Sequence, residues 1–369
     1  MKKKILLLPG DGIGHEITEE AEKLFNWLEQ NSPLDFEIDK NSIGGHSIDQ
    51  FGEPLTDHVL NKAHVSDAIL LGAVGGPKWE TLDFEIRPER GLLKIRKELD
   101  LYANFRPAIV FDALKSSSSL KENIISNLDI MIIRELTSGI YFGEPRGIEV
   151  ISKDKKKGFN TLVYFTEEIE RIAIIAFETA MKRKKRLCSI DKANVLESTE
   201  LWRDVVNSIS KKYPDVEISH MYVDNAAMQL VRNPKQFDVI VTTNMFGDIL
   251  SDCASMLTGS LGMLPSASLG NINKTNNSRK AMYEPVHGSA PDISGKNLAN
   301  PLAMLQSLGM MLEYSFNFTD LNNLLKKSIN NLLSKGYRTA DIYTDQGEKK
   351  LTTSEMGDLV IDELNKLKK

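Results

Sequence analysis

The sequence predicts an α/β protein in which parallel β-strands alternate with helices. Near the N-terminus, the apolar segment KKKILLLPG precedes the amphipathic segment HEITEEAEKLFNWLEQ, and strand-like DFEIDK and DAILLGAVGGPKW flank helix-like TDHVLNKAHVS. Later in the chain, RLCSIDKAN, EISHMYVD and DVIVTTN are strand-like, and a helix-like segment follows each of them. Because ligands of such folds bind at the carboxyl ends of the strands, the loops after these strands are where we look for a site.

Other segments give the remaining elements. Thr56 is the expected N-cap of the helix TDHVLNKAHVS. NFRPAIVF, LDIMIIREL and SGIYFGEPRGIEVI are strand-like, and the Lys-rich segment SKDKKKGFN after the last of them predicts a projecting β-arm near residues 134–160. EEIERIAIIAFETAMKRKK is a strong helix candidate. After Gly259 the chain is loop-rich and then ends in helices such as ANPLAMLQSLGMMLEYSF.

The composition favours a globular cytoplasmic protein of two or three domains. Of the 369 residues, 41% are hydrophobic and 26% charged, and the net charge of −5 argues against a basic surface for nucleic acid. Cys188 and Cys253 have neither a metal-binding spacing nor the pattern of a disulfide framework, which suits a reducing compartment. The apolar stretch that ends at Pro9 is too short for a signal peptide or a membrane span. We therefore expect neither a nucleic acid nor a membrane as a partner.

The glycine-rich turn LPGDGIGHE suggests a dinucleotide-binding turn but does not match one. Gly10 and Gly12 fit the first two positions of the G-x-G-x-x-G pattern, whereas His15 stands at the third and Gly14 comes one residue early. The pattern of the glycines alone therefore leaves the role of this turn open.

Three aspartates could hold a metal ion. Asp248 and Asp252 in NMFGDILSDCASML are four residues apart on a predicted helix, so their carboxylates share a face and repel each other. Mg²⁺ or Mn²⁺ between them would remove the repulsion. The alternative is that Asp248 stabilises the helix N-terminus and Asp252 is simply exposed. Asp224 in YVDNAAMQL could be a third ligand, although an N-cap is the favoured interpretation of that residue alone.

Basic and aromatic side chains near strand ends could bind and convert an acidic substrate. Arg96, Arg106 and Arg134 could clamp a dicarboxylate through bidentate hydrogen bonds, or form ordinary surface ion pairs. Lys192 follows a strand and could act as a general base beside a metal, although a surface lysine is the simpler interpretation. Tyr141 could deliver a proton, or be a core or interface residue.

The late loop EPVHGSAPDISGKNLANP could hold a nucleotide. His287 offers a flat ring to a base, and Asp292 could accept a hydrogen bond from a ribose 2′-hydroxyl and would repel a 2′-phosphate. The alternative is an elaborate turn before a helix, with Asn300 as its N-cap and Pro301 at its first position.

Taken in order along the chain, these motifs resemble those of the β-decarboxylating dehydrogenases, the isocitrate/isopropylmalate dehydrogenase family. The resemblance spans LPGDGIG, GAVGGPKW, RGLLKIRKELDLYANFRP, RELTSGIYFGEPRG, SIDKANVL, MYVDNAAMQL, NMFGDILSD and EPVHGSAPDISGKNLANP. It implies a non-Rossmann two-domain fold with a large mixed, largely parallel sheet flanked by helices. Residues 1–101 and 259–369 would bind the cofactor, and residues 102–258 would bind substrate and metal and form a homodimer. Lys192 and Asp224 would reach the active site of the neighbouring subunit.

Within the family, the chain is most similar to the members that act on 3-isopropylmalate. The implied reaction is the NAD-dependent oxidative decarboxylation of (2R,3S)-3-isopropylmalate to 4-methyl-2-oxopentanoate and CO₂, in leucine biosynthesis. The resemblance implies that Lys192 accepts the hydroxyl proton and that Tyr141 protonates the enolate. It also implies that Mg²⁺ or Mn²⁺ is held by Asp224, Asp248 and Asp252, and that the substrate is bound by Arg96, Arg106, Arg134 and Asp224.

The resemblance also implies which side chains select the substrate and the cofactor. Leu92 and Leu93 are apolar where a site for isocitrate would need polar groups, and with Val195 they resemble a pocket for the isopropyl group. Asp292 in place of a basic residue favours NAD over NADP. The implied cofactor contacts are Glu89, Asn194, Glu284, His287, Gly288, Ser289, Ala290, Asp292 and Asn300.

Two rival functions stay open at this point. A sister enzyme would act on D-malate, tartrate, isocitrate or homoisocitrate, and the leucine pair argues mainly against the tricarboxylates. A catalytically silent regulatory subunit would be expected to lack one of the acids, the lysine or the tyrosine, and all of them are present.

Overall fold

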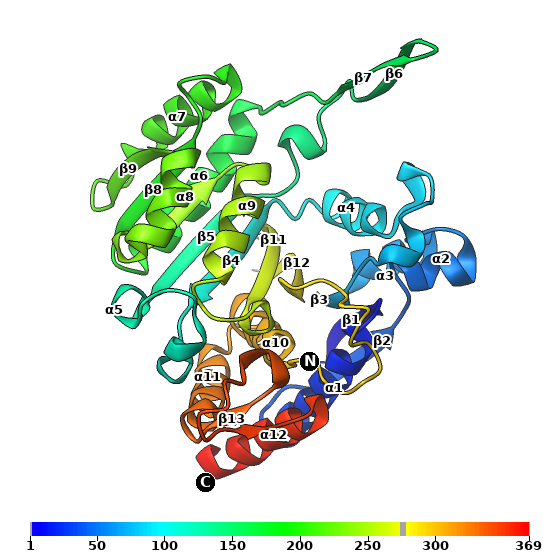
Figure 1. The fold of residues 1–369 in the computed structure, drawn as a ribbon, viewed down its shortest axis with the longest axis vertical. Helices are drawn as coiled ribbons and strands as arrows, with labels where there is room; N and C mark the ends of the chain where they lie inside the picture. Colours follow the sequence, from blue (N-terminus) through cyan, green and yellow to red (C-terminus); the bar gives the residue numbers. More distant parts are fainter. Residues whose placement is uncertain (1, 274–277, 369) are drawn as a thin grey trace. The chain divides into compact units, whose positions relative to one another are not determined.

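The computed structural model describes residues 2–273 and 278–368, and the chain divides into two compact units (Figure 1). Unit 1 comprises Met1–Leu101, Ile109–Asn127 and Ser255–Lys369, and unit 2 comprises Tyr102–Ala108 and Leu128–Ala254. Both units are therefore built from segments that are distant in sequence.

The strands of unit 1 form a mixed array. Their order is β2 (Phe36–Lys40), β1 (Lys3–Gly10), β3 (Ala68–Ala73), β12 (Ser278–Pro285) and β11 (Pro265–Asn273). The first four are parallel, and β11 is antiparallel to β12. Two small strands, β13 (Tyr337–Arg338) and β14 (Lys349–Lys350), pair separately.

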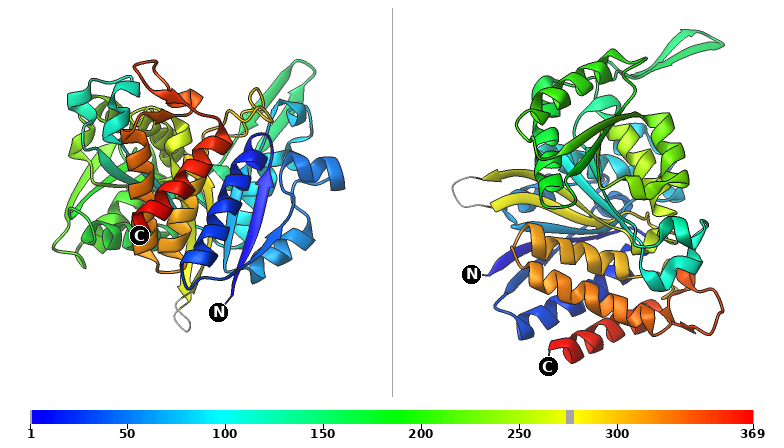
Figure 2. Two further views of the ribbon diagram at one scale, coloured as in Figure 1. Left: turned by 90° about the horizontal axis from the view of Figure 1, so that it is seen from below. Right: turned by 90° about the vertical axis from the view of Figure 1, so that its left-hand side faces the viewer.

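Consecutive apolar side chains on β1 and β3 point to opposite faces of this array, and both faces are buried. Leu6 and Leu8 belong to a core cluster with residues of β3, α3 (Asp57–Val65) and α4 (Pro88–Glu98). The other face is covered by α1 (Gly14–Asn31), which buries Ile17, Leu24 and Leu28 at helical spacing, and by α10 (Leu302–Tyr314). α11 (Thr319–Ser334) and α12 (Thr353–Lys368) complete this layer, and α12 lies beside α1 (Figure 2).

Short helices complete unit 1. These are α2 (Gly45–Phe51) and α5 (Glu122–Ile125). The predicted cap of α3 is confirmed, because the Thr56 hydroxyl accepts a hydrogen bond from the backbone N–H of Val59 at 3.3 Å.

Unit 2 repeats the strand–helix pattern. Its strand order is β4 (Ala103–Ile109), β5 (Asp129–Glu135), β10 (Val239–Thr242), β8 (Arg186–Asp191) and β9 (Glu217–Tyr222), and the last four strands are parallel. Its helices are α6 (Thr166–Met181), α7 (Glu197–Ser210), α8 (Val223–Arg232) and α9 (Asn244–Ser255). α7, α8 and α9 follow β8, β9 and β10, so their first turns gather at the carboxyl ends of parallel strands.

A hairpin of β6 (Gly147–Ser152) and β7 (Lys155–Phe159) projects from the rest of unit 2 (Figure 1). The expectation that SGIYFGEPRG is part of a strand was wrong, because Gly139–Tyr141 form a turn of 3₁₀ helix. Gly139 has φ +77°, and a Cβ at this position would lie 2.3 Å from the hydroxyl of Tyr164. The chain therefore turns here and cannot continue as a strand.

The predicted fold class is confirmed: the protein is α/β, with mixed, largely parallel strands flanked by helices. None of the helices within residues 2–273 and 278–368 is long and apolar enough to cross a membrane.

Candidate active site

A cluster of charged side chains surrounds the first turns of α9 in unit 2. Arg134, at the end of β5, places Nη1 2.5 Å from Oδ1 of Asp248, and Tyr141 donates a hydrogen bond from Oη to Oδ2 of Asp248 at 3.0 Å. Arg106 on β4 places Nη1 3.4 Å from Oδ1 of Asp248 and 3.5 Å from Oδ1 of Asp252. The structure thus brings together five residues that the sequence analysis took from three separate motifs, the aspartate pair, the arginines and the tyrosine.

Burial and neighbouring charges shift the pKa values of Tyr141 and Asp252. Burial raises the pKa of the Tyr141 phenol, and the adjacent Asp248 carboxylate raises it further, so this tyrosine stays protonated near neutral pH. Burial also raises the pKa of Asp252, and the like charge of Asp248 adds to the rise while Arg106 opposes it. A cation bound by both carboxylates would favour their ionised forms.

The predicted third carboxylate, Asp224, belongs to a different group. Asp224 lies in the first turn of α8, and its Oδ1 is 2.7 Å from Nζ of Lys192, which follows β8. Within residues 2–273 and 278–368, no three His, Cys, Asp or Glu side chains come together in a way that could hold a metal. In the described part of the chain, the α9 pair Asp248 and Asp252 therefore has no third such side chain beside it.

The partly exposed Lys192 and the exposed Asp224 lie beside a network around the buried carboxylate of Asp191. Asp191 accepts hydrogen bonds from Nε and Nη2 of Arg203 at 2.9 and 2.8 Å, and the Arg203 guanidinium lies over the ring of Tyr222. Nζ of Lys192 is 5.8 Å from the centre of the same ring. The neighbouring residues predicted for cofactor and substrate, Asn194 and Val195, are exposed.

Arg96 and Glu284 form a buried ion pair in unit 1. Nη2 of Arg96 on α4 donates to Oε1 of Glu284 on β12. Nε of Arg96 is inaccessible and has no hydrogen-bond partner among the described residues. The sequence analysis assigned one residue to the substrate and the other to the cofactor, and it did not anticipate that they pair.

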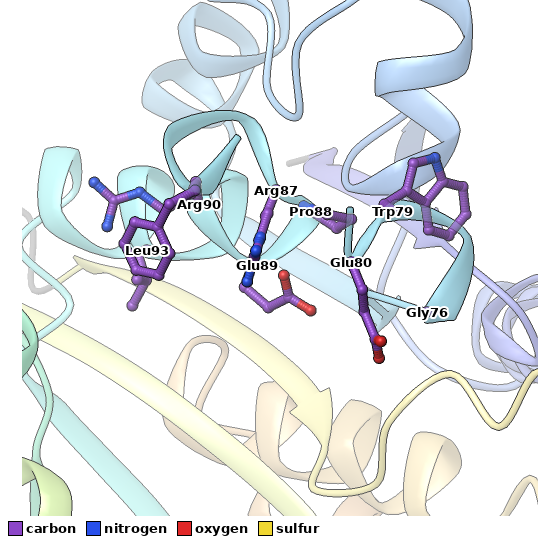
Figure 3. A pocket seen from close by; sticks show the side chains of 9 residues that line it. Gly76, Trp79, Glu80, Arg87, Pro88, Glu89, Arg90 and Leu93 are labelled. Carbon is purple, nitrogen blue, oxygen red and sulfur yellow. The ribbon is translucent and has the colours of Figure 1, made fainter. Parts of the chain in front are cut away.

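A pocket of about 280 Å³ opens in unit 1 where α4 begins (Figure 3). Figure 3 shows the acidic ends of Glu80 and Glu89 and the basic ends of Arg87 and Arg90 around it. Leu93 lines this pocket, whereas Leu92 packs against the core cluster beside α3. The complete lining is Gly76, Trp79, Glu80, Phe84, Arg87, Pro88, Glu89, Arg90 and Leu93.

The late loop of unit 1 is held by the glycine-rich turn. Ile13 donates a backbone hydrogen bond to the carbonyl of Ser289 at 2.8 Å, and a Cβ on Gly12 would lie 2.0 Å from the same oxygen. Nδ1 of His287 contacts the Gly288 carbonyl at 2.9 Å, and its Nε2 is inaccessible without a partner among the described residues. Burial lowers the pKa of His287, so a neutral ring is available for a base.

Other residues of this loop differ in the exposure and hydrogen bonding of their side chains. Asp292 is exposed and Ala290 half-buried. Asn300 is buried, accepts a hydrogen bond from the N–H of Leu302 at 3.0 Å and donates one to Asp341 at 3.0 Å. Asn300 therefore supports the start of α10, although the helix begins at Leu302 and not at Pro301.

Comparison with known proteins identifies the family. The family described as isocitrate/isopropylmalate dehydrogenase matches residues 4–360. The chain belongs to the isocitrate/isopropylmalate dehydrogenase family. The family predicted from the sequence motifs is thereby confirmed.

Similar members of the family match over their full length. The 3-isopropylmalate dehydrogenase of Pseudomonas savastanoi pv. phaseolicola is 57% identical, with 100% of both chains covered. That of Saccharophagus degradans is 58% identical, covering 98% of this chain and 99% of its own. Among solved structures of the family, isocitrate dehydrogenase from Methylococcus capsulatus has a TM-score of 0.86 and 31% identity, covering 98% of this chain and 99% of its own.

The structure also decides two of the alternatives left open by the sequence. Asp224 is not an N-cap, because α8 begins one residue earlier, at Val223. Asp248 does not serve the first turn of α9, because the helix begins at Asn244 and the Asp248 carboxylate is occupied by Arg134 and Tyr141.

The sequence analysis missed Asp11. Its carboxylate is 2% exposed and accepts hydrogen bonds from the backbone N–H groups of Gly45, His46 and Gly75 at 2.8, 2.7 and 2.8 Å. The sequence Gly-Asp-Gly is a signal that could have found it, because glycines on both sides permit the positive φ values that the turn adopts and that aim the side chain.

Proposed function

We propose that the chain catalyses the NAD-dependent oxidative decarboxylation of (2R,3S)-3-isopropylmalate to 4-methyl-2-oxopentanoate and CO₂, a step of leucine biosynthesis. The observation that carries this proposal is the cluster of Arg106, Arg134, Tyr141, Asp248 and Asp252, in which guanidinium, phenol and carboxylate groups face one another. The full-length relatives named 3-isopropylmalate dehydrogenase support the same substrate.

The two carboxylates of α9 fit a divalent cation. Asp248 and Asp252 both approach Nη1 of Arg106, so one positive charge already lies within reach of both. We propose that they hold Mg²⁺ or Mn²⁺ together with Asp224 of a second copy of the chain. When bound, the ion would supply a Lewis acid for the oxygen at C2 of the substrate.

The side chains of the protein would bind the substrate and transfer its protons. Arg106 and Arg134 would bind the carboxylates of the substrate by charge-assisted hydrogen bonds, and the same role is proposed for Arg96. Lys192 would accept the proton of the 2-hydroxyl as hydride passes from C2 to NAD. After CO₂ leaves, Tyr141 would protonate the enolate at C3, for which its raised pKa keeps the proton available.

Apolar and acidic residues would set specificity. We propose that Leu92, Leu93 and Val195 favour an isopropyl group over a third carboxylate; Leu93 lines the pocket, and Leu92 packs against the core cluster behind it. Glu89 would face the nicotinamide ribose. Its carboxylate packs closely on Gly75, because a Cβ on Gly75 would lie 2.6 Å from Oε1 of Glu89.

The cofactor would be NAD, held mainly by the late loop. The exposed carboxylate of Asp292 would accept hydrogen bonds from the ribose hydroxyls and would repel a 2′-phosphate. We propose the same loop, His287 to Ala290 with Asn300, together with Glu284 and Asn194, as further cofactor contacts. Residues 1–101 and 259–369 would then form the cofactor-binding domain and residues 102–258 the substrate and dimerisation domain.

The functional unit would be a homodimer with shared active sites. The Lys192 and Asp224 pair is complete but lies apart from the α9 carboxylates in its own chain, which fits a contribution to the site of a neighbour. Exposed apolar side chains on the hairpin, such as Ile148 and Val150, offer a surface for pairing. The proposed location is the cytoplasm, with which two free cysteines are compatible.

The proposal is tested by following NAD reduction at 340 nm with Mg²⁺ and 3-isopropylmalate, D-malate or isocitrate, and then with NADP in place of NAD. We expect strong preference for 3-isopropylmalate and NAD. Preference for D-malate or isocitrate would show that the apolar pocket is assigned wrongly, and preference for NADP would remove the role of Asp292. A folded protein that turns over none of these substrates would support the silent regulatory subunit.

A further inference from the structure

We propose that Asn244 is a positioning residue that orients the guanidinium of Arg134 toward Asp248 and thereby sets the geometry of the carboxylate-binding side of the site. The inference deepens the proposed function, on which it rests for the identity of the group that Arg134 binds. The orientation itself is argued from contacts within unit 2.

Asn244 uses its whole side-chain amide inside the protein. It is the first residue of α9, follows β10 almost directly and has no exposed surface. Oδ1 accepts hydrogen bonds from Nε and Nη2 of Arg134 at 3.0 and 2.7 Å. Nδ2 donates to the carbonyls of Leu136 and Ser138, both at 3.0 Å. An amide has two acceptor and two donor positions, so all four are used and the opposite orientation would set donors against donors.

Asn244 thereby decides which edge of Arg134 faces the site. The guanidinium is a rigid planar fork, so fixing Nε and Nη2 fixes the direction of Nη1 as well. Nη1 lies 2.5 Å from Oδ1 of Asp248, and the guanidinium carbon lies 5.7 Å from the centre of the Tyr141 ring. Arg134 is 3% exposed along its side chain, so water gives little help in orienting it.

The stem of Arg134 is held by the same turn of α9. A Cβ on Gly247 would lie 2.6 Å from Cγ and 2.7 Å from Cβ of Arg134. Because Gly247 has no side chain, the aliphatic part of Arg134 can pass close over the backbone of α9. The head and the stem of Arg134 are both placed by residues of α9, although Arg134 itself belongs to β5.

The first turn of α9 is itself anchored. The N–H of Asn244 donates to the hydroxyl of Tyr164 at 2.8 Å, and Tyr164 is buried. Burial holds the pKa of Tyr164 well above its ordinary value, so the hydroxyl stays neutral. Asn244 therefore joins the segment after β5, the segment before α6 and the start of α9.

Loss of the amide would free the cationic head. Arg134 could then pair with both oxygens of Asp248, which are the groups that would be needed by the metal and by Tyr141. Because small misplacements of a binding group cost about 100-fold in rate, the effect should be large and confined to the acidic substrate.

The first test compares Asn244→Ala with Thr242→Val by steady-state kinetics. Thr242 lies two residues earlier and donates to the Ile190 carbonyl at 2.8 Å in an equally buried site, so its replacement also removes a buried hydrogen bond. We expect Asn244→Ala to lower kcat/KM for 3-isopropylmalate roughly 100-fold, with an increased KM for it and a KM for NAD within about twofold. Thr242→Val should change each constant by only a few-fold. Equal losses in the two variants, or a matching rise in the KM for NAD, would overturn the proposal.

A second test asks whether Asn244 acts through Arg134. Lysine lacks the paired N–H groups that contact Asn244, so in an Arg134→Lys background the further change Asn244→Ala should cost only a few-fold. A cost of about 100-fold in that background would mean that Asn244 acts independently. If Asn244→Ala folds poorly, Gly247→Ala displaces the arginine stem with the amide intact and should give the same rise in the KM for 3-isopropylmalate alone; no such rise would contradict the proposal.

The crystal structure of the Asn244→Ala variant tests the orientation without relying on activity. We expect Nη1 of Arg134 to leave the position it holds beside Oδ1 of Asp248. A guanidinium that superposes on the wild-type one would refute the positioning role even if 3-isopropylmalate proves to be the substrate. A displaced guanidinium in an enzyme that prefers another substrate would keep the positioning role and discard only the proposed function.

Discussion

At the scale of single residues, Asp11 explains what the glycine-rich turn does. Gly10 and Gly12 adopt φ of +74° and +56°, and between them the Asp11 carboxylate is aimed at three backbone N–H groups of the segments 45–46 and 75. Burial raises the pKa of Asp11, and these three donors oppose the rise. The turn therefore joins loops of unit 1 and also holds the Ser289 segment, in place of the phosphate contact expected of a dinucleotide turn.

Replacing Asp11 by Asn should weaken unit 1. One carboxylate oxygen becomes an NH₂ group that faces backbone donors, so at least one charge-assisted hydrogen bond is lost, at a cost of about 2 kcal/mol. The same change should raise the KM for NAD more than that for 3-isopropylmalate. Urea unfolding and kinetics of Asp11→Asn measure both effects. Asp67→Asn, which alters a carboxylate bonded to the N–H of Lys4 near the surface, is the control and should cost much less.

Glu135 gives the protein a predictable pH dependence. It is fully buried, and burial raises its pKa from 4.5 to about 7 against hydrogen bonds from Thr137 and Ser138 and the charge of Arg171. The folded state therefore binds this proton more tightly than the unfolded state does. Its contribution to stability is complete below about pH 4.5 and is lost as the pH rises through about 7, up to about 3 kcal/mol.

The measurement is the thermal unfolding of Glu135→Gln and of the unmodified protein between pH 5 and pH 8. The variant should lose less stability over this range, because glutamine does not titrate. Glu149→Gln, on the exposed hairpin, should follow the unmodified protein. Parallel curves for Glu135→Gln and the unmodified protein would show that Glu135 does not titrate there.

At the scale of elements, α8 and α9 carry apolar side chains that one chain leaves uncovered. Met228 and Val231 are 60% and 52% exposed and lie three residues apart on α8, and Ile249 is similarly exposed on α9. Residues three apart share one face of a helix. α8 thus has an apolar stripe of the kind that packs against another helix, and α9 adds a single exposed apolar side chain, Ile249.

Charges in the stripe of α8 should separate the proposed dimer. The double change Met228→Lys and Val231→Lys buries two ammonium groups if the helices pair, so we expect a monomer in sedimentation or light scattering and loss of most activity. Val65→Lys, at an equally exposed apolar position at the end of α3, should leave the assembly unchanged. A stable dimer of the double variant would place the interface elsewhere.

At the scale of the whole molecule, shared active sites predict complementation. Lys192→Met and Asp252→Asn should each abolish turnover. In a dimer of one chain of each kind, one site would combine Lys192 of one subunit with Asp252 of the other and be intact. Statistical mixing after refolding should then recover about a quarter of the unmodified activity. Recovery of none would mean that each chain completes its own site.

The sequence by itself determined the elements, the family and the chemical character of the site. The alternation of apolar segments, the Thr56 cap and the placing of Asp248 and Asp252 on one face of α9 all follow from local rules that act within a few residues. Whole motifs in order then sufficed to recognise the family. Motifs of this kind also pointed to Arg106, Arg134 and Tyr141, although not to the way in which they meet.

Only the tertiary structure decided which partners these residues have. Asp11 meets groups 34 and 64 residues away, Asn244 reaches Arg134 across 110 residues, and Arg96 pairs with Glu284 across 188 residues. No periodicity or spacing relates such positions, because their contact is set by the order in which strands join the sheet. Gly139 and Gly247 belong to the same class, since what excludes a Cβ at each is a side chain distant in the sequence, Tyr164 or Arg134.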